Sequence, residues 1–71
     1  MTDYDEVLDE CQRLADYWMN EQDVYDVEVV PVKDEYRLTI ISRLEGDEYT
    51  EWWDTLDQVD GVISRTVAEI A

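Results

Sequence analysis

The stretch VYDVEVVPVKDEYRLTIISRL, residues 24–44, decides the fold because its apolar residues recur at every second position. One set of alternating positions is apolar in both halves, namely Tyr25, Val27, Val29, Tyr36, Leu38 and Ile40. A period of two is typical of a half-buried β-strand, in which successive side chains point to opposite faces. The two runs, joined by a short polar segment, predict an antiparallel hairpin with one apolar face.

Polar residues in the middle of this stretch predict where the chain turns. A two-residue turn at positions 34–35 places Val29 opposite Ile40 on the core side and Asp26 opposite Arg43 on the other side. The apolar faces of both strands then agree. The turn lacks the Asn-Gly or Asp-Gly pair that such a tight connection prefers, and a longer loop is the alternative.

The second face of the hairpin carries Val30, Val32 and Ile41. Pro31 has no N–H to donate to a neighbouring strand, which predicts that the first strand lies at a sheet edge. A two-stranded sheet is marginally stable by itself. We therefore expect this face or edge either to form a homodimer through the hairpin or to be covered by the second helix.

Residues 4–19 have the periodicity of an amphipathic helix. Thr2 or Asp3 can cap its start, and Asp5 and Glu6 lie in the first turn, where negative charge interacts favourably with the helix dipole. At about 100° per residue one face collects the apolar side chains, which are Tyr4, Val7, Leu8, Cys11, Leu14, Ala15, Trp18 and Met19.

Two interpretations compete for the C-terminal third of the chain. In a helix from Asp47 to Ile70 the apolar residues share one face, namely Tyr49, Trp52, Trp53, Leu56, Val59, Ile63, Thr66, Val67 and Ile70. Asp60 followed by Gly61 also has the pattern of a helix stop before a β-branched strand, Val62–Ile70. We favour the helix and expect Trp18 and Trp52 to pack in the core.

These patterns together predict a single acidic α+β domain over residues 1–71. Its order is helix, β-hairpin, helix (αββα), with two helices packed on a small antiparallel sheet. The alternative order is αββαβ, if Val62–Ile70 is a strand.

A net charge of −15, from 20 acidic and 5 basic residues, is the most unusual property of the chain. Such a charge repels nucleic acid and anionic membranes and attracts basic surfaces. We therefore expect no direct binding to nucleic acid and no membrane contact, but a partner with a basic protein surface. One cysteine, an acidic start and the lack of a long uncharged run predict a cytoplasmic protein.

Groups that catalyse reactions near neutral pH are scarce. The chain has no His, and the helical periodicity makes its one cysteine, Cys11, a core residue. Asp54, Asp57 and Asp60 recur every three residues but lack the alternate spacing and closing Glu of a calcium loop. We predict no catalytic residue, no metal ligand and no cofactor, and hence a protein that is not an enzyme.

The acidic residues are predicted to form two rows on the helices, opposite the apolar stripes. The candidate partner-binding residues are Asp5, Asp9, Asp16, Asp47, Glu51, Asp54 and Asp57. Steps of four residues space charges by about 6 Å along a helix, while each strand of a DNA duplex carries a phosphate every 3.4 Å or so. Two neighbouring rows approach that density and can occupy a basic groove built for nucleic acid.

In size, acidity and lack of a catalytic group the chain resembles small phage-encoded inhibitors that imitate nucleic acid, including anti-restriction and anti-CRISPR proteins. The resemblance covers composition and no motif. It implies a viral inhibitor that acts in the host cytoplasm on a nucleic-acid-binding protein. Two alternatives fit the charge: a salt-adapted (halophilic) cytoplasmic domain whose function the sequence does not reveal, or an antitoxin-like acidic partner.

Overall fold

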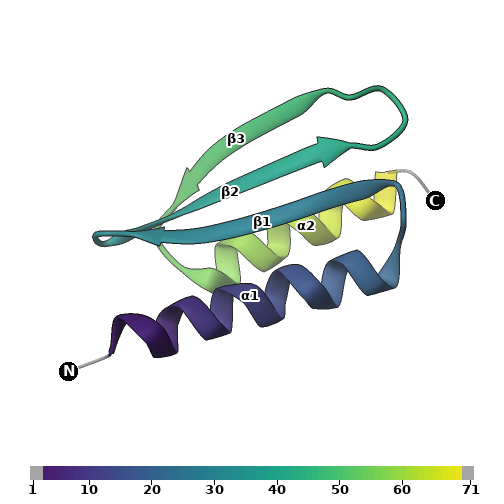
Figure 1. Cartoon of the computed structure of the whole chain (residues 1–71). Helices are drawn as coiled ribbons and strands as arrows, with labels where there is room; N and C mark the ends of the chain where they lie inside the picture. Colours follow the sequence, from purple (N-terminus) through teal and green to yellow (C-terminus); the bar gives the residue numbers. More distant parts are fainter. Residues whose placement is uncertain (1–2, 70–71) are drawn as a thin grey trace.

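The chain folds in the order helix, three strands, helix (Figure 1). The computed structural model describes residues 3–69. The elements are α1 (Tyr4–Glu21), β1 (Tyr25–Val32), β2 (Glu35–Ser42), β3 (Glu48–Trp53) and α2 (Leu56–Glu69). The predicted α+β class, with two helices on a small antiparallel sheet, is confirmed, and a third strand changes the order to αβββα.

The hairpin of β1 and β2 closes through a two-residue turn at Lys33 and Asp34. Lys33 has a φ of 56°, in the left-handed region that tight hairpin turns use. The turn lies one residue earlier than predicted, so Val29 pairs with Leu38 and not with Ile40. The partner is displaced by two positions, and an even displacement keeps every side chain on its predicted face.

The predicted neighbours Asp26 and Arg43 meet diagonally. Asp26 pairs with Ile41 across the ladder, and the guanidinium of Arg43 reaches it with 2.6 Å between Nη2 and Oδ1. This hydrogen bond raises the pKa of Arg43 above its ordinary value, with the charge of Asp26 acting in the same direction. The pair joins β1 to the end of β2.

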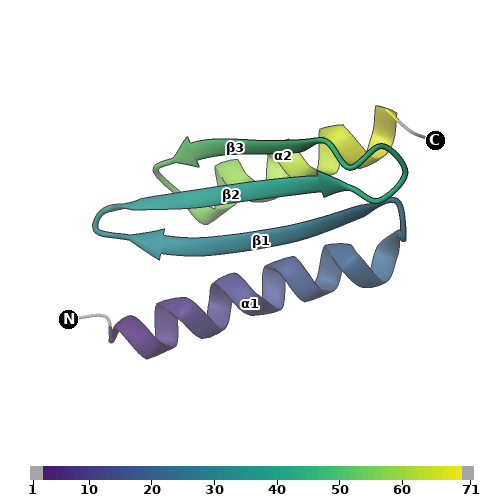
Figure 2. The same ribbon diagram turned by 45° about the horizontal axis from the view of Figure 1, so that its top comes forward.

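The strand order is β1-β2-β3, with β1 at one edge as Pro31 predicted. Both helices cover the same face of this sheet: α1 runs along β1, and α2 lies beside α1 (Figures 1 and 2). α2 therefore does not cover Val30, Val32 and Ile41, which the register places on the opposite face, where they are half-buried. The core between sheet and helices consists of Cys11, Ala15, Val27, Val29, Leu38, Ile40, Val59, Val62 and Ile63.

α1 agrees with the sequence prediction. The carboxylate of Asp3 caps it by accepting from the backbone N–H of Asp5 at 3.3 Å, and Thr2, the other predicted cap, lies outside the described residues. Of the predicted stripe, Cys11 and Ala15 are buried, whereas Tyr4 at the start is exposed.

The front half of the predicted C-terminal helix is wrong, because Glu48–Trp53 forms β3. Before it the chain turns back on β2, with the N–H of Gly46 donating to the carbonyl of Ser42 at 2.8 Å. Gly46 has a φ of 76°, which a glycine adopts without steric cost. In a strand, adjacent residues point to opposite faces, so Trp52 leaves the core and is 50% exposed, contrary to the prediction.

The back half of that helix is confirmed as α2. It continues through Gly61 to Glu69, so the alternative strand at Val62–Ile70 is wrong over its described part, and Ile70 lies outside the described residues. No helix in residues 3–69 is both long enough and apolar enough to cross a membrane.

Candidate acidic binding surface

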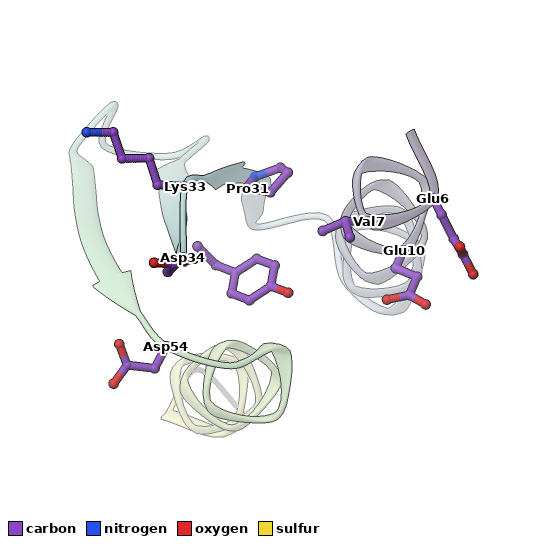
Figure 3. Close-up of a pocket in the computed structure, with 8 residues that line it drawn as sticks. Glu6, Val7, Glu10, Pro31, Lys33, Asp34 and Asp54 are labelled. Atoms are coloured by element: carbon purple, nitrogen blue, oxygen red, sulfur yellow. The ribbon is translucent and has the colours of Figure 1, made fainter. Parts of the chain in front are cut away.

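Acidic residues from three separate segments border a cleft at the end of the molecule that holds the β1–β2 turn (Figure 3). The cleft has a volume of about 600 Å³, and its lining residues are Glu6, Val7, Glu10, Pro31, Lys33, Asp34, Tyr36 and Asp54. Figure 3 shows Val7 pointing into the space between α1 and the hairpin, with Glu6 and Asp54 at its outer sides and Lys33 extending away. The cleft thus combines an apolar floor with an acidic rim.

A second hollow, of about 430 Å³, lies between α1 and α2. Its lining residues are Glu10, Arg13, Leu14, Leu56, Asp57 and Asp60. Glu10 borders both hollows, so they lie next to each other along α1. We call the two together the acidic groove, whose carboxylates are Glu6, Glu10, Asp34, Asp54, Asp57 and Asp60.

A capping box at the start of α2 fixes one side of the groove. The hydroxyl of Thr55 accepts from the N–H of Gln58 at 3.2 Å, and the amide oxygen of Gln58 accepts from the N–H groups of Thr55 at 3.1 Å and Asp54 at 3.0 Å. This reciprocal bonding satisfies backbone donors that a helix start leaves free. It sets the short connection from β3 to α2 and so orients Asp54 and Asp57.

One direct hydrogen bond ties the two helices that flank the groove. The indole N–H of Trp18 on α1 donates to the carboxylate of Asp60 on α2 at 2.8 Å. Since these residues are 42 positions apart, the contact holds the two acidic segments together across the fold.

Few cations balance the groove. Within residues 3–69 the ion pairs are Asp9 with Arg13, Glu28 with Arg37 and Asp26 with Arg43. None of them uses a carboxylate of the groove, and Arg13, which borders the second hollow, lies 2.9 Å from Asp9. The groove therefore presents carboxylates that remain open to cationic groups of another molecule.

The seven residues singled out in the sequence do not form two helical rows. Asp54 and Asp57 line the groove. The other members lie elsewhere and are exposed: Asp5, Asp9 and Asp16 on α1, Asp47 in the loop after β2, and Glu51 on β3. The second row fails because its first half is a strand and not a helix.

Sequence reasoning missed four carboxylates of the groove, namely Glu6, Glu10, Asp34 and Asp60. Glu6 and Glu10 are spaced by four residues on α1, which is a local signal of a shared helix face. No local pattern indicates that Asp34, which lies in a turn, borders the same cleft as Glu6 and Glu10, because that arrangement depends on how α1 packs along β1.

The chemistry of the groove suits organic cations better than metal ions. Among the residues that the structure describes, no group of three or more His, Cys, Asp or Glu side chains could hold a metal ion. Apolar floors next to carboxylates accommodate the aliphatic stem and the charged head of a Lys or Arg side chain. The arrangement can therefore bind a basic protein surface.

Comparison with known protein families, curated proteins and solved structures gave no match.

Proposed function

We propose that the chain is a non-enzymatic acidic binding protein that imitates nucleic acid and occupies the basic DNA- or RNA-binding groove of a partner protein. In this proposal the chain acts in the cytoplasm, in the manner of the phage-encoded anti-CRISPR and anti-restriction inhibitors. The observation that supports the proposal best is the acidic groove, which six carboxylates from separate segments line without an ion pair among the described residues.

The overall charge density is consistent with such mimicry. The longest dimension of the molecule is 39 Å, and dividing it by the net charge of −15 gives about 2.6 Å per charge. Duplex DNA carries one charge per 1.7 Å or so of axis, and a single strand of it one per 3.4 Å. A protein surface that binds duplex or single-stranded DNA would therefore meet a similar density of negative charge on this chain. Solubility alone needs only about 2 to 8 charges.

Contacts would divide into two kinds. Asp57 and Glu10, beside the apolar floor of Leu14 and Leu56, would hold partner Lys or Arg side chains with part of their length desolvated. Charges outside the groove, such as Asp5 and Asp16, would mainly accelerate association and produce a strong salt dependence.

The test is capture from nuclease-treated host lysate on the immobilised chain, followed by elution with duplex DNA or with salt. The groove variant is Glu10→Lys with Asp57→Lys. The matched control, Glu21→Lys with Glu45→Lys, makes the same charge change at exposed positions at the end of α1 and in the loop before β3, neither of which lines the groove. We expect nucleic-acid-binding proteins that DNA displaces, at least tenfold weaker capture by the groove variant and near-normal capture by the control. Equal effects of both variants, or capture that DNA does not displace, would refute the proposal.

The salt-adapted domain stays as the second candidate because the folded core is small for so large a charge. Among the described residues, the largest side chains exposed by less than 2% are those of Leu38, Ile63, Val59 and Cys11. Raising salt from 0.1 M to 1 M shortens the Debye length from about 10 Å to about 3 Å, so both candidates gain stability. Only a salt-adapted chain should be largely unfolded at 0.1 M, whereas a cooperative unfolding transition in dilute buffer favours the inhibitor.

A further inference from the structure

β3 is a free edge of the sheet. The N–H of Ser42 donates to the carbonyl of Asp47 at 2.8 Å, which sets the bonding pattern between β2 and β3. In an antiparallel ladder alternate residues bond the neighbouring strand, so the N–H and C=O groups of Glu48, Thr50 and Trp52 point outward. No backbone hydrogen bond from another described segment reaches these groups.

The two edges of the sheet differ in how they are protected. β1, the other edge, contains Pro31, which has no N–H to offer, and α1 runs along it (Figure 2). β3 contains neither a proline nor a bulge, and within residues 3–69 its only neighbour in the sheet is β2. An unprotected edge is a template for pairing with a further strand.

Aromatic side chains flank this free edge on both faces. Trp52 is 50% exposed on the face that no described helix covers, and Tyr49 is 63% exposed on the helix-facing side. An edge that is protected only by its charged residues would not need exposed aromatic side chains such as Trp52 and Tyr49. Exposed aromatic surface next to unpaired backbone groups is typical of a surface that contacts another protein.

A cavity of about 310 Å³ opens under β3, on the side of α2. Its lining residues are Tyr25, Ile40, Tyr49, Glu51, Thr66 and Glu69. Neither Glu51 nor Glu69 takes part in an ion pair within the described chain. The last turn of α2 contains no basic residue, so the negative end of its dipole adds to the attraction for a cation.

We propose that β3 is a docking site for an extended basic segment of a partner protein, which pairs antiparallel with β3 as a fourth strand and places a Lys or Arg side chain in the cavity under β3. Backbone bonds to Glu48, Thr50 and Trp52 would provide affinity, and alternate side chains would provide specificity. This surface is separate from the acidic groove, and the inference does not depend on the function proposed for that groove.

Charge selects a basic segment over a second copy of this chain. Two copies, each with a net charge of −15, would repel each other, and pairing along β3 would bring Glu48 and Glu51 close to like charges. A Lys or Arg side chain instead meets Glu51 and Glu69, with its aliphatic stem against Tyr49 and Ile40.

The pairing geometry predicts which residues of the segment do which task. Residues opposite Thr50 bond the edge through their N–H groups, and their side chains share the uncovered face with Trp52. The residues between them point into the cavity and turn their N–H groups away from β3. In a peptide that alternates Lys and Thr, with Lys in the cavity, the Thr amides therefore bond the edge.

The experiment measures fluorescence anisotropy of a labelled eight-residue peptide that alternates Lys and Thr, with the full chain at 0.15 M salt. We expect N-methylation of the Thr amides to weaken binding at least tenfold, and N-methylation of the Lys amides to change it by less than threefold. The two peptides have the same charge and the same number of methyl groups, so only the bonding edge differs. Thr50→Pro, which removes one outward N–H, should weaken binding about tenfold, and Thr50→Val should not.

Several outcomes would overturn the inference. If the unmethylated peptide does not bind, or both methylated peptides bind equally, then no strand is added. If methylation of the Lys amides is the damaging change, then the segment does not add antiparallel with Lys in the cavity. Self-association that Thr50→Pro abolishes, measured by sedimentation, would show that a second copy takes the edge. Loss of groove-dependent capture leaves these results unaffected, since the variants and probes are different.

Discussion

The side chain of Gln22 holds the connection between α1 and β1, and its removal is a sharp test of the fold. Its amide oxygen accepts from the N–H groups of Val24 and Tyr25, both at 2.7 Å. Its amide nitrogen donates to the carbonyl of Trp18 at 3.1 Å and to that of Tyr25 at 2.8 Å. A single side chain thus satisfies the end of a helix and the start of a strand, groups that would otherwise need water.

The expected cost of Gln22→Ala follows from these four bonds. A hydrogen bond contributes about 0.5–1.5 kcal/mol net, and the groups here are only partly buried, so water can replace part of the loss. We therefore expect about 2 kcal/mol of destabilisation. A chain of 71 residues has a total stability of about 4–11 kcal/mol. At about 4–8 °C per kcal/mol, Tm should fall by about 8–16 °C.

Thermal unfolding followed by circular dichroism at 1 M KCl is the appropriate assay, because this salt screens the repulsion between acidic residues. Gln12→Ala is the matched control, since Gln12 is exposed on the same helix and Ala is a good helix former. Gln22→Glu keeps the acceptor but loses both donors and adds a negative charge at the end of α1, so it should also be destabilised. A fall in Tm below about 3 °C for Gln22→Ala would refute the reasoning.

Two further predictions concern the backbone and the core. Gly61→Ala should stabilise α2 by about 0.5–1 kcal/mol, since an added Cβ meets no atom within 4 Å. Gly46→Ala, at a φ of 76°, should instead destabilise the chain by about 1–2 kcal/mol. Urea titrations would contradict this if both variants changed the free energy of unfolding in the same direction. Burial, and secondarily the charge of Glu10, raises the pKa of the Cys11 thiol, so the unfolded chain releases the proton first and stability should fall as the pH rises past about 8.5. Cys11→Ala should lower Tm at neutral pH but reduce its decline between pH 7.5 and 9.5, and an unchanged decline would show that the thiol does not cause it.

Residues 4–44 could be predicted from the sequence because their patterns admit one secondary structure. The alternation around Val27 and Leu38 suits only a strand, and the stripe that includes Cys11 and Ala15 suits only a helix. The hairpin register could not be predicted from the alternation, since it depends on which residue accepts a positive φ, and Lys33 does so without the glycine that usually marks the position.

The net charge and the scarcity of catalytic groups are properties of composition, and the sequence by itself determined them. Only tertiary structure decided what residues 47–53 become. Their local pattern fits a helix face, but β2 offers an unpaired edge, and the turn at Gly46 brings the chain back along it, so backbone hydrogen bonds to β2 outweigh helical periodicity. The acidic groove likewise exists only because α1 and α2 pack side by side on one face, which brings Glu10 and Asp57 to a common surface although they are remote in the chain.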